Sequence, residues 1–306
     1  MQRRSFLHQS AMAAAGFVIF PGCKTNKMIP ISSVNSGTYR FEEIRRGVGY
    51  FEEKGGTIGW SIRKNAVSVV DTQFPDQAKN LLAEIDKYHK GQKIDLLINT
   101  HHHGDHTSGN IVLKDRIGVH VAHENAINHY KRVAAEQNAM DKAVFPTVSF
   151  SDTTRFEVGD EDIRLYYFGP AHTNGDAVVH YEKANVAHLA DLIFNRRFPY
   201  IDKTAGANIQ SWVQVLDKVL HTFSKETVFI FGHKGEGYQV TGNAEDVRAF
   251  QNYLEKLLEF GQSCIVSGRN LAEVKAGTVV IPGAEEWKGD GIGRSLDAVF
   301  AELALE

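Results

Sequence analysis

The chain has 306 residues, of which 42% are hydrophobic and 23% charged, so it is long enough to bury a full hydrophobic core. These proportions exclude an intrinsically disordered or fibrous protein. Lys and Arg number 34 against 37 Asp and Glu, and the resulting net charge of -3 argues against a nucleic-acid partner. With 2 cysteines and 14 histidines, any metal site must be built from imidazole and carboxylate.

The first residues have the composition of an export signal. Arg3 and Arg4 precede an apolar run over residues 11–20, which is shorter than the ~20 residues that a membrane-spanning helix needs. The paired arginines resemble a twin-arginine translocation signal, and Gly22 followed by Cys23 resembles a lipobox, in which the cysteine carries a lipid. We therefore expect a periplasmic or otherwise exported lipoprotein whose membrane contact is a lipid anchor at Cys23. A frayed amino terminus with a buried cysteine is the alternative.

Turn residues and apolar periodicity predict strands and helices in alternation from about Thr38 onward. The expected strands cover residues 39–50, 57–62, 66–70, 94–98, 118–122, 163–168, 177–181, 186–190 and 228–231. The expected helices cover residues 76–88, 124–136, 209–223, 244–261, 271–277 and 295–305. Since no fixed-period repeat is present, the chain divides into a signal peptide (1–22), a flexible linker (23–37) and one α/β domain (38–306).

The strongest signal for chemistry directly follows the strand expected at residues 94–98. Residues 101–106 read His-His-His-Gly-Asp-His, which places four imidazoles and one carboxylate within six residues. Side chains alternate along extended backbone, so His101 and His103 face one side and can bind one ion. His102 faces the other side, and we expect it to pack behind the site.

Further metal-binding residues extend this pattern. The backbone can turn at Gly104, so Asp105 and His106 can face a second ion beside the first. Isolated donor residues follow three later strands, where α/β sheets commonly place their sites: His172, Asp191 and His233. A histidine-rich loop without a ligand role would not predict these additional residues.

The order H-x-H-x-D-H, then His, then Asp, then Gly-His over residues 38–261 resembles the metallo-β-lactamase-fold hydrolases. The resemblance implies that residues 38–306 form a catalytic domain with the α/β fold of that family, a four-layer αββα sandwich of two mixed sheets with outer helices. It implies one zinc ion held by His101, His103 and His172, a second held by Asp105, His106 and His233, and Asp191 bridging both. Asp71 matches an early Asp of the family that supports the metal-binding loops from behind.

The same resemblance implies a reaction. Two zinc ions that share a water lower its pKa toward ~7, so that a metal-bound hydroxide attacks a carbonyl carbon, and Asp105 or a bound water returns the proton to the leaving group. The expected activity is hydrolysis of a small ester, thioester, lactone or amide. Hydrolysis of β-lactams is the alternative, and a non-catalytic metal-binding protein of the cell envelope is the alternative of another class.

Two arginines are candidates for substrate binding. Arg196 and Arg197 follow Asp191 closely, and from there a guanidinium can meet a carboxylate of the small-molecule substrate near the metals. An exposed loop whose arginines contact solvent is the alternative interpretation.

The lipid anchor is tested in cells that express the full chain. We expect Cys23→Ser to leave the membrane fraction, because the only predicted anchoring group is lost. Replacing Arg3 and Arg4 by lysine should block export, which fractionation of the cells measures. A Cys23→Ser protein that still partitions with membranes contradicts the anchor.

Overall fold

Consecutive strands build an eight-stranded sheet in the computed structural model, which describes residues 30–304. In order across the sheet these strands are β1 (Val34–Asn35), β2 (Arg40–Arg45), β3 (Val48–Glu52), β4 (Ile58–Arg63), β5 (Ala66–Val70), β6 (Ile94–Ile98), β7 (Ile117–His123) and β8 (Val148–Phe150). Short turns make β1 to β5 antiparallel, whereas β5 to β8 run parallel because longer segments, some helical, connect them. The sheet is therefore mixed.

A second mixed sheet of six strands follows. In order across the sheet its strands are β14 (Thr241–Gly242), β13 (Val228–Lys234), β12 (Val186–Asn195), β11 (Ala177–Tyr181), β10 (Glu161–Tyr167) and β9 (Thr153–Val158). The one parallel pair is β12 with β13, and α5 connects the two strands. The helices are α1 (Pro75–His89), α2 (Gly104–Thr107), α3 (Asn110–Leu113), α4 (Glu124–Glu136), α5 (Ile209–Thr222), α6 (Ala244–Val266), α7 (Leu271–Gly277) and α8 (Ile292–Leu303), with 3-10 turns at Lys114–Arg116 and Lys203–Ala205.

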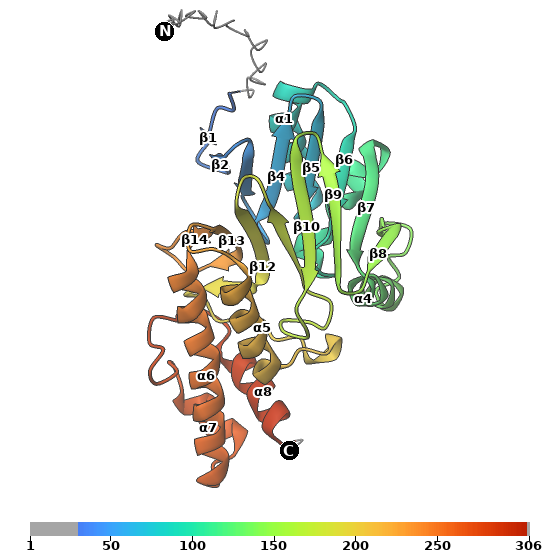
Figure 1. Ribbon diagram of the computed structural model, residues 1–306. Coiled ribbons are helices and arrows are strands. Elements are labelled where there is room, and N and C mark those ends of the chain that lie inside the picture. The colour runs from blue at the N-terminus through green and yellow to red at the C-terminus, as the bar shows by residue number, and fades with distance from the viewer. Residues whose placement is uncertain (1–29, 305–306) are drawn as a thin grey trace, which may run out of the picture.

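Three layers of buried apolar side chains hold these elements together. On one outer face Leu81 of α1 packs in a cluster with Trp60 of the first sheet. Between the sheets Leu96 and Tyr181 belong to one cluster, and on the other outer face Trp212 of α5 lies in a cluster with residues of α6 and α8. Helices thus cover both outer faces of two packed sheets (Figure 1), and the predicted four-layer αββα sandwich is confirmed.

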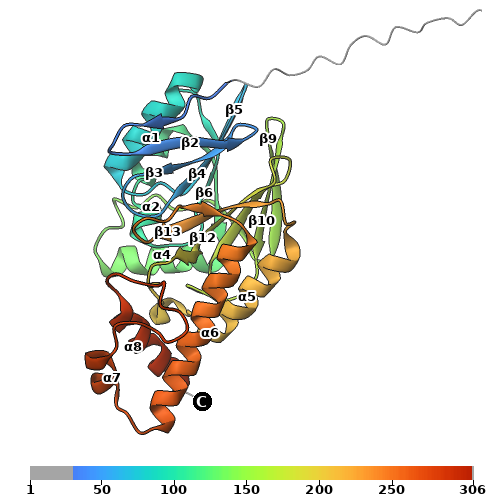
Figure 2. The ribbon, with the colours of Figure 1, turned by 90° about the vertical axis from the view of Figure 1, so that its left-hand side faces the viewer.

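The carboxy-terminal helices extend the molecule beyond the sheets. Figures 1 and 2 show α6, α7 and α8 at the end of the molecule opposite to β1 and α1. Among the described residues, no helix combines the length and the hydrophobicity needed to cross a membrane.

Some expected boundaries were wrong. The strand expected at residues 39–50 is the hairpin of β2 and β3, because Arg46 and Gly47 take left-handed backbone conformations with φ of 52° and 67°. The predicted linker (23–37) contains β1, which pairs with β2. The strand expected to end at residue 190 continues as β12 to Asn195. The predicted signal peptide (1–22) and the predicted lipid-anchor residue Cys23 lie outside the described residues.

Candidate metal centre

Residues from distant parts of the chain meet at one edge of the two sheets. Asp71 directly follows β5, and the histidine-rich segment follows β6 and continues into α2. His172 lies in the loop between β10 and β11, and His233 lies near the end of β13. Side chains that lie at or just after the carboxyl ends of strands therefore form one cluster.

Asp191 reaches this cluster because β12 is irregular. The register between β12 and β13 shifts on both sides of Ala190, whose φ of 46° is in the left-handed region. On β13, a Cβ at Gly232 would lie 2.1 Å from Asp191 Oδ1, so only glycine fits beside this carboxylate. The irregular strand and the glycine together place Asp191 among the histidines.

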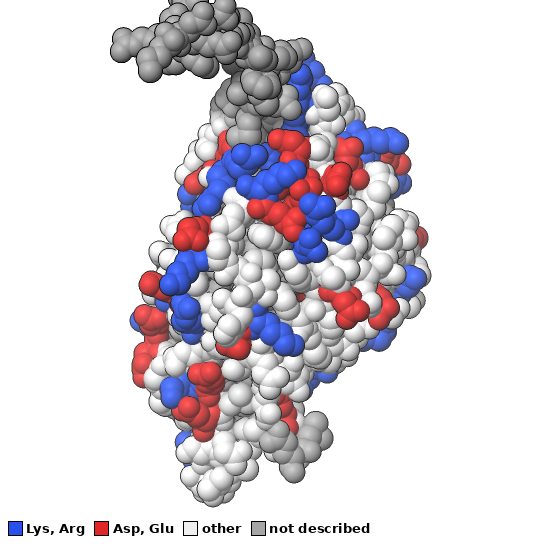
Figure 3. Space-filling model, viewed as in Figure 1, with Lys and Arg blue, Asp and Glu red and all other residues white. Residues whose placement is uncertain are grey.

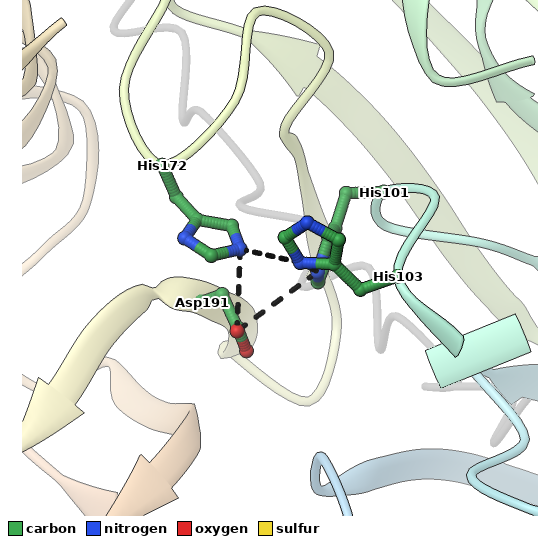
Figure 4. Close-up of side chains that lie close together, drawn as sticks. All are labelled: His101, His103, His172 and Asp191. Atoms are coloured by element: carbon green, nitrogen blue, oxygen red, sulfur yellow. Dashed lines mark hydrogen bonds and ion pairs between the residues drawn. The ribbon is translucent and has the colours of Figure 1, made fainter. Parts of the chain in front are cut away.

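The first group of donor atoms comprises His101, His103, His172 and Asp191 (Figure 4). His103 Nδ1 lies 3.1 Å from His101 Nε2 and 2.9 Å from His172 Nε2. Asp191 Oδ2 lies 3.4 Å from His172 Nε2 and 3.9 Å from His101 Nε2. The structure thus brings together four of the predicted ligands from three separate segments.

The hydrogen bonds behind these rings decide which nitrogens can bind a cation. A neutral imidazole has one N–H and one lone pair. His172 Nδ1 donates to the Tyr200 carbonyl oxygen at 2.7 Å, and His103 Nε2 donates to Asp202 Oδ2 at 2.9 Å. His101 Nδ1 lies 3.1 Å from the Thr100 hydroxyl, which itself donates to Asp71. In their neutral forms all three rings therefore direct lone pairs toward one another, and a cation is the group that satisfies them.

The second group comprises Asp105, His106 and His233. His233 Nε2 lies 3.3 Å from Asp105 Oδ2 and 3.3 Å from Asp191 Oδ2, so Asp191 stands between the two groups. His106 Nε2 and Asp191 Oδ1 are 3.0 Å apart, yet both buried atoms lack a hydrogen-bond partner within residues 30–304. Buried polar atoms without partners are rare, and a cation between these two would compensate both.

The two groups differ in charge. Burial lowers the pKa of His172 to about 3, and burial together with His106 lowers the pKa of His101 well below its usual value, so both imidazoles are neutral at pH 7. Burial also lowers the pKa of His233, but Asp191 and Asp105 outweigh it and raise this pKa to about 9. A metal ion in the second group would therefore have to displace a proton from His233, and its binding would strengthen as the pH rises toward about 9.

Asp71 lies behind both groups and is fully buried. Its carboxylate accepts hydrogen bonds from the Thr100 amide at 2.8 Å, from the Thr100 hydroxyl at 2.7 Å and from His106 Nδ1 at 2.7 Å. In the neutral His106 ring the last bond places the proton on Nδ1, so that the lone pair of Nε2 faces the second group. Asp71 therefore orients donor atoms without being one of them.

A residue that the sequence did not indicate is Asp202. Its Oδ2 lies 2.9 Å from His103 Nε2 and 3.6 Å from His102 Nε2, so these three residues form a third group of potential donors. The hydrogen bond from His103 Nε2 to Asp202 already explains why these residues lie close together, so this third group does not need a metal ion to account for it. His102 lies behind the first group, with its ring 5.1 Å from that of His129.

A cavity of about 350 Å³ opens onto the donor atoms. It is lined by His103, Gly104, Asp105, Asp191, Phe194, Arg197, Phe198, Tyr200, His233 and Arg294. Arg197 thus faces the cavity, as does Arg294 of α8, which the sequence did not indicate. Arg196 does not line it, because its guanidinium lies 3.0 Å from Asp246 and 3.1 Å from Glu286.

Comparison with known proteins identifies the family. The sequence profile of the metallo-beta-lactamase superfamily matches residues 62–233, which is more than half of the chain and includes both donor groups. The chain belongs to this superfamily. Its metal-dependent hydrolases support a hydrolytic role for the two groups of His and Asp residues.

Individual members of the superfamily are distant from the chain. A metallo-beta-lactamase type 2 of Bacillus cereus is 23% identical over 207 residues, which cover 65% of this chain and 77% of that protein. A hydroxyacylglutathione hydrolase of Chelativorans sp. is 32% identical over 99 residues, 32% of this chain and 34% of that protein. A double mutant of the sec-alkyl sulfatase PisA1 of Pseudomonas sp. has a similar fold, with a TM-score of 0.67 and 13% identity over 86% of this chain and 50% of its own.

The role of Asp202 can be separated from its other contacts. Its Oδ1 accepts hydrogen bonds from the Thr204 and Ala205 amides, which an asparagine oxygen can also accept. We expect Asp202→Asn to keep the fold but to present an amide N–H to His103 Nε2, so that the ring carries its proton on Nδ1 instead. Because Nδ1 is the donor atom, Zn²⁺ affinity should fall about 10- to 100-fold. Competition with a chelator measures this, and unchanged affinity contradicts the role.

Proposed function

We propose that the protein is a binuclear zinc-dependent hydrolase that acts on a small carbonyl compound, an ester, thioester, lactone or amide. The observation that carries the proposal is the convergence of two donor groups, with Asp191 between them, on one cavity. Imidazole and carboxylate donors in these numbers suit zinc. A purely structural metal site is normally closed by its ligands, whereas these donor atoms face open space that a substrate can enter.

Zinc ions bound to these groups would supply an activated water and polarise the substrate carbonyl. The chain's own residues hold and direct this chemistry. Burial raises the pKa of Asp105, but His106 and His233 outweigh it and keep this pKa well below its usual value. Asp105 is therefore an ionised carboxylate that lines the cavity, and we assign to it the acceptance of the water's proton and its transfer to the leaving group.

The cavity also accounts for substrate orientation. Arg197 is exposed on the loop after β12 and lines the cavity beside Asp191 and Tyr200. A guanidinium there can pair with a carboxylate of the substrate. On the face seen in Figure 3, acidic and basic side chains alternate without a broad basic surface, which favours a small-molecule substrate over nucleic acid.

Hydrolysis of β-lactams is a second candidate. The similarity to the Bacillus cereus metallo-beta-lactamase extends over 77% of that protein's length, which favours this candidate. A β-lactam is itself a cyclic amide with a neighbouring carboxylate, so the same cavity and the same arginine would serve it. The two candidates differ only in substrate.

Metal content tests the two donor groups. Protein purified without chelators should contain close to two equivalents of a divalent ion, because each group offers at least three donors. Asp191→Asn should lower this content, since it removes the charge between the groups. Elemental analysis measures both, with Asp217→Asn on the exposed surface of α5 as the matched control. Full metal content in the Asp191→Asn protein would contradict a bridging role for Asp191.

A substrate panel tests the reaction. We expect the zinc-loaded protein to hydrolyse esters, lactones or β-lactams and to leave diaryl phosphodiesters largely intact. His103→Ala should lower kcat/KM by about 100-fold or more because the first group loses a nitrogen donor. His221→Ala is the control, since this side chain is exposed on α5. Efficient phosphodiester cleavage without any acyl hydrolysis would contradict the carbonyl substrate while leaving the metal centre intact.

A further inference from the structure

We propose that Arg294 of α8 and Arg197 of the loop after β12 together bind a carboxylate of the substrate. The carboxy-terminal helices would then form part of the active site, although the superfamily profile ends at residue 233. This inference rests on the proposed function and names a substrate class for it, an acyl compound that carries a second, free carboxylate.

The first reason is that both arginines line the cavity without an acidic partner within residues 30–304. Arg197 and Arg294 are exposed, line the cavity with Asp105 and His233, and form no ion pair within residues 30–304. Arg196, the neighbour of Arg197, shows the contrast because two carboxylates neutralise it. Cations without a partner at the mouth of a cavity favour an anionic ligand.

The second reason is that Arg294 is held toward the metal centre. Its guanidinium lies 5.5 Å from the centre of the Tyr200 ring, and that ring lies 5.3 Å from the ring of His103. A cation over an aromatic face is stabilised there. Because the Arg294 side chain is already restricted, less conformational entropy is lost when a ligand binds to it. Tyr200 therefore connects Arg294 to the first donor group.

The third reason is that α8 is fixed to the loop that carries Arg197. The Ser295 hydroxyl lies 3.4 Å from the Pro199 carbonyl oxygen, and Arg197 forms a β-bridge with Lys288. A Cβ at Gly291 would approach Phe198 Cβ to 3.4 Å, so the start of α8 lies directly against this loop. The two arginines thus belong to segments that hold each other in place.

The chemistry of the cavity favours a carboxylate at this position. Two zinc ions would outweigh the charges of Asp105 and Asp191, so no acidic group would remain to repel an anion. Guanidiniums bind planar carboxylates through paired N–H donors, and two of them can share one carboxylate. A cavity of about 350 Å³ suits a small acyl compound with one end at the metals and the other at the arginines.

Two esters of equal length test the proposal: 4-nitrophenyl hydrogen glutarate, which carries a free carboxylate, and the neutral 4-nitrophenyl pentanoate. For the zinc-loaded Arg294→Gln protein we expect KM for the glutarate ester to rise about tenfold, with the pentanoate ester changed less than about twofold. Arg294→Lys should recover part of the loss because it keeps the charge. Arg248→Gln, an exposed position on α6, is the matched control.

Direct binding gives a readout that does not depend on turnover. Calorimetry should show that the zinc-loaded protein binds glutarate more tightly than pentanoate and that Arg294→Gln removes most of this preference, with unchanged metal content. Equal effects on both ligands, or none, would overturn the role of Arg294 and leave the hydrolase proposal standing. If no ester, thioester, lactone, amide or β-lactam is hydrolysed but the glutarate preference depends on Arg294, the hydrolase proposal fails and the arginine site stands. Arg294-dependent hydrolysis of a secondary alkyl sulfate, without a glutarate preference, would overturn the carboxylate assignment.

Discussion

The buried carboxylate of Asp191 is the charge on which the arrangement of the site depends. Its side chain is only 4% exposed, and an ionised carboxylate in such a place is stable only with close partners of opposite charge. Burial raises its pKa, but His233 and His106 outweigh burial and hold it well below the usual value. To bring this group among the histidines, β12 interrupts its register at Ala190, and β13 carries a glycine where any side chain would collide. The irregular pairing of β12 with β13 therefore places one carboxylate between two groups of donors.

The two groups of donor residues could be predicted because their members lie at or just after the ends of the apolar strands expected from the sequence. Residues 101–106 are contiguous and follow an apolar strand, and the helices Glu124–Glu136 and Leu271–Gly277 coincide with the ranges expected from periodicity. The β2–β3 hairpin was missed because its turn begins with an arginine in the left-handed region, a residue that gives no turn signal. The three-residue strand β8 was missed because a strand of this length carries little periodicity, and β9 was missed because most of its six residues are polar.

The residues that orient the donors and face the substrate could not be predicted in the same way. Asp202 and Arg294 lie far in sequence from the histidines, and only the folding of the loop after β12 and the docking of α8 bring them to the site. The adjacent Arg196 and Arg197 have different surroundings because Arg196 has left-handed backbone, with φ of 57°. Spacing alone cannot decide which of two neighbouring side chains enters a cavity.

The loop over residues 196–202 connects the carboxy-terminal helices to the metal centre. It provides the Tyr200 carbonyl oxygen for His172 and the Asp202 carboxylate for His103. On its other side the loop contacts α8. Glu302, near the end of α8, accepts hydrogen bonds from the first two amides of α5 and forms an ion pair with Lys203. The donors themselves come from strand ends that the two sheets fix independently. Because the same loop orients His172 and His103, only a substitution that keeps α8 docked, such as Arg294→Gln, would alter substrate binding while the donor groups keep their geometry. Such a substitution would separate substrate choice from metal chemistry within one cavity.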